Sequence, residues 1–88
     1  MLIRFHPQGW EDYLHWQQTD RAMVRKINQL IQDIQRTPFT GLGKPEPLRH
    51  EWSGYWSRRI TDEHRLVYFV GNDTVDILQC RFHYDRKS

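Results

Sequence analysis

The 88 residues are enough for one domain with a modest core, and 38% hydrophobic with 27% charged residues is typical of a folded globular chain. No apolar run approaches the ~20 residues that a membrane helix needs, and the first residues are too polar for a signal peptide. The single cysteine, Cys80, excludes an internal disulfide and indicates a reducing cytoplasm. The net charge of +2 does not alone indicate a nucleic-acid ligand. We expect a single cytoplasmic domain over residues 1–88.

The N-terminal segment predicts a strand followed by a helix. Residues 2–6 alternate weakly, as a strand does, and Pro7 can occupy the first turn of a helix. A helix is expected over residues 8–18, where three apolar residues fall at helical spacing: Trp10, Tyr13 and Leu14. Trp16 lies off that stripe and is expected to make a second contact.

The strongest helical pattern covers residues 20–36. Its apolar stripe consists of Met23, Ile27, Leu30, Ile31 and Ile34. Asp20 suits the N-cap, and Pro38 ends the helix because proline disfavours the helical conformation in the residue before it. The polar residues on the other side are interpreted as a solvated face: Arg21, Arg25, Lys26, Gln29, Gln32, Asp33 and Arg36.

A loop with three prolines and two glycines, residues 38–47, follows this helix and is expected to lack regular structure. Glu46 lies between Pro45 and Pro47. The first proline restricts the backbone before Glu46, and the second excludes the helical region for Glu46 itself. A carboxylate is therefore held on a stiff, extended segment. The alternative interpretation is a rigid connector without a chemical role.

A basic β-hairpin is expected over residues 55–70. Two runs of aromatic and branched residues flank a short polar turn, and they carry Arg58, Arg59 and Arg65. Because burying an arginine without a partner is costly, these guanidinium groups are expected to line a wet face suited to phosphates. Arg59 and Arg65 share a face if an odd-length turn joins the strands, and lie on opposite faces if the turn has two residues.

Two more strands are expected. Residues 48–52 predict a short one, and residues 74–84 predict the last, after a tight turn at residues 71–73. In the last strand two sets of side chains would face opposite ways. One set is Leu78, Cys80 and Phe82, and the polar set, facing the hairpin's arginines, is Gln79, Arg81 and His83.

The element order predicts an α+β fold, in which both N-terminal helices pack on one face of a twisted antiparallel β-sheet. Several common kinds of site do not match the sequence. There is no phosphate-binding loop of the GxxxxGK type and no Ser-His-Asp elbow. Metal ligation is not expected, because Cys80 and His83 would point to opposite faces and the other histidines lack ligand spacing. No cofactor is expected.

The remaining candidates suit metal-free RNA cleavage, which needs a base for the ribose 2′-OH, cations for the phosphorane and an acid for the 5′-oxygen. They are Glu46, Arg59, Arg65, Arg81, His83 and Tyr84. Taken singly, each has an ordinary explanation as a surface or edge residue, so the hypothesis depends on their joint occurrence. On a regular strand His83 and Tyr84 face opposite ways, so joint action requires a twist or bulge.

Six stretches, specific in combination, point to a known family. They are Trp10-Glu11-Asp12-Tyr13, Arg36-Thr37-Pro38-Phe39, Gly43-Lys44-Pro45-Glu46-Pro47-Leu48, Gly54-Tyr55-Trp56-Ser57-Arg58-Arg59-Ile60, Glu63-His64-Arg65-Leu66-Val67-Tyr68 and Cys80-Arg81-Phe82-His83-Tyr84. From residue 10 to residue 84, the chain resembles the YoeB toxins of the RelE/ParE superfamily. The resemblance implies a microbial-RNase-like fold and a ribosome-dependent endoribonuclease that cuts translated mRNA in the A site and stops translation.

The resemblance also assigns roles to residues and implies partners. Glu46 would be the general base, His83 the general acid and Arg65 the phosphate-stabilising cation, with Arg59 and Tyr84 in support. Lys44 and Arg49 would bind RNA, with Arg58 and Arg81 as further RNA-binding candidates. The implied partners are a cognate antitoxin, the ribosome with its mRNA, and a second copy in a homodimer. Operator DNA is expected only through the antitoxin complex, and no membrane is expected.

Two alternatives remain open at this stage. One is a non-catalytic toxin like the gyrase-directed branch of the superfamily, which lacks the base and acid pair. The other is a general RNA-binding domain, which predicts binding of free RNA with steep salt dependence. The chain departs from the family at residues 85–88, which follow the terminal His-Tyr and could add RNA contacts.

Overall fold

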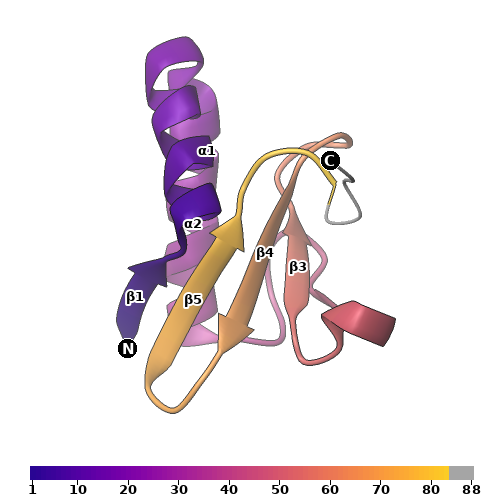
Figure 1. The fold of residues 1–88 in the computed structure, drawn as a ribbon. Helices are drawn as coiled ribbons and strands as arrows, with labels where there is room; N and C mark the ends of the chain where they lie inside the picture. The colour runs from indigo at the N-terminus through magenta and orange to yellow at the C-terminus, as the bar shows by residue number, and fades with distance from the viewer. Residues whose placement is uncertain (84–88) are drawn as a thin grey trace.

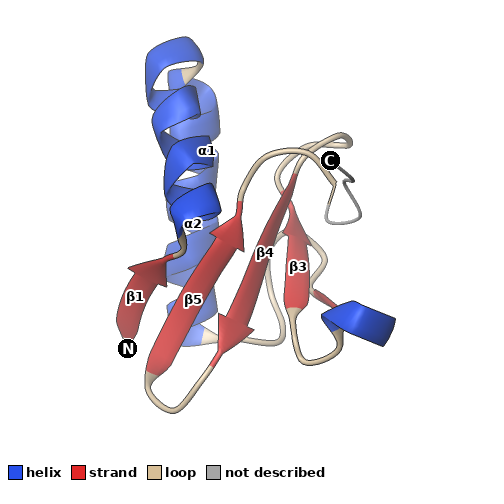
Figure 2. Cartoon of the chain, in the orientation of Figure 1, coloured by secondary structure: helices blue, strands red, loops and turns tan. Residues whose placement is uncertain are grey.

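The computed structural model describes residues 1–83 and contains two helices packed on one face of a five-stranded sheet (Figure 1). The helices are α1 (Pro7–Thr19) and α2 (Arg21–Arg36). The strands are β1 (Leu2–Phe5), β2 (Glu46–Pro47), β3 (Trp56–Arg59), β4 (Arg65–Val70) and β5 (Thr74–Gln79). Figure 2 separates these elements from the loops by colour. The expected α+β class is confirmed.

The sheet is mixed rather than fully antiparallel. Its strand order is β1-β5-β4-β3-β2, and β2 to β5 pair antiparallel as expected. The expectation is wrong for β1, which pairs parallel with β5. Parallel neighbours need a long connection, and the two helices with strands β2 to β4 supply it.

Of two further predicted strands, one is absent and the other is shorter than expected. The strand predicted over residues 48–52 is wrong: after the buried Leu48 the chain forms a 3-10 helix, His50–Trp52, and the φ of 59° at His50 is incompatible with a strand. Strand β5 ends at Gln79 instead of residue 84, and Phe82 has a φ of 63°. The expected shared face of Leu78, Cys80 and Phe82 is therefore wrong.

The core lies between the helices and the sheet. The predicted stripe of α2 is confirmed for Met23, Ile27, Leu30 and Ile34, which are buried in one cluster with residues of β4 and β5, whereas Ile31 is only partly buried. Asp20 caps α2 by accepting a hydrogen bond from the Ala22 N–H. No helix among residues 1–83 is both long and apolar enough to cross a membrane.

Helix α1 buries Trp16 rather than the whole predicted stripe, of which Tyr13 packs partly buried against the core. Trp16 is 8% exposed in the core, whereas Trp10 is 46% exposed. The reason is a close approach at Gly9, where a Cβ would lie 2.6 Å from the Ile77 carbonyl oxygen of β5. Gly9 thus sets the side of α1 that meets the sheet, and Trp16 lies two turns further along that side.

Candidate functional site

Arg59 and Arg65 lie together on the sheet face that points away from the helices, here called the open face. In β4, Leu66 and Tyr68 belong to the core on the helix side, so Arg65 points the other way. Arg59 is the direct cross-strand partner of Arg65, and opposed residues share a face. The connection between the strands comprises residues 60–64, an odd number. Of the two alternatives that the sequence left open, the one in which Arg59 and Arg65 share a face is therefore correct.

Glu46 lies on the same open face. It pairs with Ser57, which has the same parity in β3 as Arg59, and Ser57 pairs in turn with Val67. Glu46 is exposed, and its backbone forms strand β2, so the extended segment predicted between the two prolines is confirmed. The carboxylate and the two arginines therefore share one surface.

The guanidinium of Arg65 is held over the β3–β4 turn. Its Nη1 donates to the carbonyl oxygens of Thr61, Asp62 and His64 at 2.7, 3.0 and 3.1 Å. Within residues 1–83, its Nε and Nη2 have no hydrogen-bond partner. Since arginine carries five N–H donors, the fixed Nη1 leaves a forked pair of nitrogens suited to an oxyanion.

A bulge and a side-chain amide connect the backbone of His83 to the open face. Pairing of β4 with β5 shifts between Val67 and Tyr68, so that Val67 pairs with Gln79 and Leu78 is the extra residue. Glu46, Ser57, Val67 and Gln79 thus form one row across four strands. The Gln79 amide donates to the His83 carbonyl oxygen at 3.2 Å. Gln79 has the predicted orientation, but it is buried rather than solvated.

The segment 80–83 crosses from the end of β5 over β4 towards the β3–β4 turn (Figure 1). There the Phe82 carbonyl oxygen accepts a hydrogen bond from the Arg65 N–H at 3.0 Å. His83 therefore follows a residue whose backbone is bonded to Arg65. The predicted carboxylate and the two arginines thus share one side of the sheet, and the backbone of the predicted histidine is hydrogen-bonded to Gln79, which lies on the same side.

Comparison with known proteins places the chain in a family. The family model of YoeB-like toxins of bacterial type II toxin–antitoxin systems matches residues 5–84. Toxin YoeB of Escherichia coli K12 is 58% identical over 84 residues, covering 96% of this chain and 100% of the relative. This chain belongs to the YoeB family. It is thus a toxin of a type II toxin–antitoxin system, as the six stretches predict.

Solved YoeB structures share the fold. The YoeB/ParE toxin from Agrobacterium tumefaciens superposes with a TM-score of 0.93 at 55% identity, covering 96% of this chain and 100% of that one. Staphylococcus aureus YoeB was solved as a dimer, with a TM-score of 0.90, 48% identity, and 96% and 98% coverage. It was also solved in a heterotetrameric complex with YefM, with a TM-score of 0.88, 49% identity, and 96% and 99% coverage. The YoeB-like fold class is therefore established.

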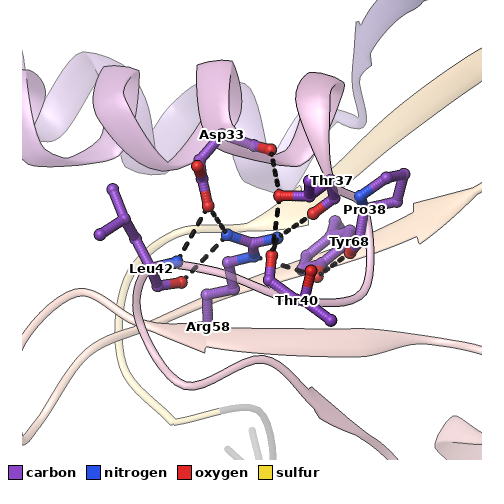
Figure 3. Close-up of polar contacts among 7 residues, drawn as sticks. All are labelled: Asp33, Thr37, Pro38, Thr40, Leu42, Arg58 and Tyr68. Atoms are coloured by element: carbon purple, nitrogen blue, oxygen red, sulfur yellow. Dashed lines mark hydrogen bonds and ion pairs between the residues drawn. The ribbon is translucent and has the colours of Figure 1, made fainter.

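Arg58 departs from the expectation that all three hairpin arginines line a wet face. It pairs with Leu66 on the helix side and is 0% exposed. Its guanidinium donates to five oxygens (Figure 3): Asp33 Oδ2 at 2.6 Å, Thr37 O at 2.7 Å, Thr40 O at 2.8 Å, Leu42 O at 3.0 Å and Tyr68 Oη at 3.2 Å. The premise that an unpartnered buried arginine is costly holds, but Arg58 has partners. RNA cannot reach it in this arrangement.

The Arg58 network organises the loop that leads to Glu46. The oxygens of Thr37, Thr40 and Leu42 all come from that loop, and Tyr68 Oη donates to the Pro38 carbonyl at 2.7 Å. The Leu42 N–H and the Arg58 guanidinium both lower the pKa of Asp33, the N–H having the larger effect. Burial raises the pKa of Tyr68, against the effect of Arg58, and so keeps the phenol protonated as a donor. The loop is therefore stiffened by this buried charge as well as by its prolines.

The other predicted site residues are dispersed. Lys44 and Arg49 are exposed on either side of β2. Arg81 is half-buried, and its guanidinium carbon lies 4.5 Å from the centroid of the Phe82 ring. Tyr84 lies outside the described residues. Sequence reasoning missed the contacts of Asp33 and Gln79, because the first was assigned to a solvated face and the second was treated only as a polar neighbour.

Proposed function

We propose that this YoeB-family toxin is a metal-independent, ribosome-dependent endoribonuclease that cleaves translated mRNA in the A site. The observation that carries the proposal is the cross-strand row from Glu46 to Gln79, whose amide bonds to the His83 backbone. It supports a base and an acid on the same side of the sheet as Arg59 and Arg65. A purely DNA- or protein-binding surface would not need this combination.

The proposed reaction is an internal transesterification. The Glu46 carboxylate takes the proton of a ribose 2′-OH, and the 2′-oxygen attacks the adjacent phosphorus. Arg65, supported by Arg59, binds the non-bridging oxygens, where charge accumulates in the phosphorane. The bond to the 5′-oxygen breaks as His83 donates its proton to that leaving group. The products are a 2′,3′-cyclic phosphate and a free 5′-hydroxyl, and Tyr84 is proposed to assist.

The ribosome would supply mRNA already extended and positioned for this reaction. Lys44, Arg49 and Arg81 are proposed to contact its phosphates, and action on ribosomes would place the toxin in the cytoplasm. By analogy with S. aureus YoeB, we propose a homodimer and inhibition by a cognate YefM-like antitoxin. Operator DNA would be bound only through that antitoxin complex.

The test is cleavage of a translated message by the purified toxin on ribosomes. Glu46→Gln and His83→Gln should each reduce the cleavage rate by about 10²–10⁴-fold, which is the usual contribution of a general acid or base. Glu51→Gln and His50→Gln are matched controls, because both residues are exposed on the neighbouring 3-10 helix. The controls should remain close to wild type.

The same variants distinguish the non-catalytic alternative. If Glu46→Gln and His83→Gln arrest growth as strongly as wild type while message on the ribosomes stays intact, the nuclease proposal is wrong. A gyrase-directed or other binding toxin would then be the better interpretation.

A further inference from the structure

The segment 80–83 has no regular secondary structure, yet it is fastened at both ends. At its start the Cys80 N–H donates to Asp12 Oδ2 at 3.0 Å, and the Cys80 carbonyl accepts from Trp16 Nε1 at 2.9 Å. Both partners are buried residues of α1. The beginning of the segment is thus fixed to the helix layer, and its direction beyond Cys80 depends on contacts further along.

Phe82 is fastened by residues at the start of β4. Its N–H donates to His64 Nδ1 at 2.8 Å, and its carbonyl accepts from the Arg65 N–H at 3.0 Å. Its φ of 63° lies in the left-handed region, which a residue with a side chain adopts at a cost. The two hydrogen bonds therefore hold a turn that the backbone would not favour alone.

The side chain of His64 is largely buried and packs against neighbouring rings. Its side chain is 13% exposed, and its ring makes edge contacts with the Trp16 ring at 4.9 Å and a tilted contact with the Phe82 ring at 5.7 Å between centroids. Because Nδ1 accepts a hydrogen bond from the Phe82 N–H, this nitrogen must be unprotonated, and the ring is neutral. Burial lowers the pKa of His64 most, and Arg81 and His15 nearby also lower it, whereas Glu63 and Asp12 oppose the shift. The neutral acceptor is therefore favoured.

We infer that His64 is a positioning residue for the cleavage reaction. By accepting a hydrogen bond from the Phe82 N–H, it orients the next residue, His83, towards the bound phosphate. The inference rests on the proposed role of His83 as the acid. His64 itself does not contact RNA. It acts through a single backbone amide, so it should affect the placement of the acid and therefore kcat, with little effect on KM.

Two substitutions separate the acceptor from the ring. His64→Phe keeps an aromatic ring against Trp16 but removes the acceptor, whereas His64→Asn keeps an acceptor close to the position of Nδ1 and removes the ring. We expect His64→Phe to lower kcat on ribosomes by about 10- to 100-fold with KM little changed, and His64→Asn to retain most activity. His15→Phe is the matched control, since His15 also contacts Trp16 but does not bond to the segment. It should behave as wild type.

A measurement independent of activity follows the amide itself. In the His64→Phe variant the Phe82 N–H should lose hydrogen-exchange protection, whereas it should stay protected in wild type and in His64→Asn. Unchanged protection in a folded His64→Phe protein would overturn the inference. So would a His64→Asn variant that is as impaired as His64→Phe.

A double-mutant cycle distinguishes failure of this inference from failure of the proposed function. If His64 acts through His83, then His64→Phe should have no further effect in a His83→Gln background. Multiplicative losses in the double variant would overturn the positioning role and leave the nuclease proposal intact. Full activity of His83→Gln alone would instead reject the acid assignment, and with it the step that His64 is inferred to support.

Discussion

Two neighbouring arginines of β3 show how differently the two faces of the sheet use the same side chain. Arg58 faces the helices, is completely buried, and donates to five oxygens. Arg59 faces the opposite way and is exposed beside Arg65. One position along a strand thus separates an arginine that holds the fold from one that is available to a phosphate.

The role of each arginine follows from its surroundings and not from its charge, which is the same at both positions. On the helix side the loop before β2 supplies carbonyl oxygens and α2 supplies Asp33, so the charge is satisfied internally. On the open face, the adjoining strand β2 carries Glu46, which is itself exposed. The helix-side network should therefore control stability, and the open face should control activity.

The largest expected effect is on stability at Arg58. Arg58→Ala should lower the free energy of unfolding by about 3–5 kcal/mol, because it leaves buried oxygens without their donor and opens a cavity. Arg59→Ala should change it by no more than about 0.5 kcal/mol. Urea unfolding of the two variants under identical conditions measures both values. Similar destabilisation by both would contradict the division between the faces.

The activity of the same pair should show the opposite order. Arg59→Ala should slow cleavage on ribosomes by about 10- to 100-fold without unfolding the protein, since one donor to the developing phosphorane charge is lost. Activity is compared with Arg49→Ala, an exposed arginine proposed to contribute only to RNA binding, which should raise KM instead. An Arg59→Ala variant with wild-type kinetics would remove Arg59 from the site.

A smaller loss of stability is expected on substitution of Tyr68, whose hydroxyl connects Arg58 to the loop before β2. Tyr68→Phe removes a hydroxyl that accepts from Arg58 Nε and donates to the Pro38 carbonyl, and should cost about 1–3 kcal/mol. Tyr55→Phe is the control, because within residues 1–83 the Tyr55 hydroxyl has no hydrogen-bond partner. The midpoints of urea unfolding, with unchanged m-values, measure the stability change in both variants. Equal, negligible changes would mean that the hydroxyl contributes nothing to the network.

The smallest expected effect is a pH dependence of the stability contributed by Asp33. The pKa of Asp33 is lowered below its usual 3.8 in the fold, so its contribution to stability is fully present above that pH and is lost as the pH falls through the lowered value. In Asp33→Asn this contribution is absent at every pH. The stability difference between wild type and Asp33→Asn should therefore shrink on acidification, as measured by urea unfolding from pH 6 downwards. A difference independent of pH would exclude an ionised Asp33 as the partner of Arg58.

Much of the fold was predictable because it follows from local patterns. The apolar stripe of α2, the Asp20 cap and the β3–β4 hairpin depend on residues a few positions apart, and each is present. The two prolines around Glu46 restrict their immediate neighbour, and the extended segment is present as well. For the same reason the family resemblance could be recognised from short stretches of sequence.

Local sequence patterns could not reveal the contacts that distinguish structural groups from proposed catalytic groups. Arg58 donates to oxygens of residues that lie 16 to 25 positions earlier in the chain, and His64 accepts from a backbone amide 18 positions later. Strand β1 pairs in parallel with β5, which lies near the other end of the sequence. Sequence periodicity reports which side of an element is apolar, whereas the partner of a polar group depends on how distant elements pack. That is why candidate site residues could be proposed from the sequence, while the burial of Arg58 and the hydrogen bond that holds the His83 backbone became visible only in the folded chain.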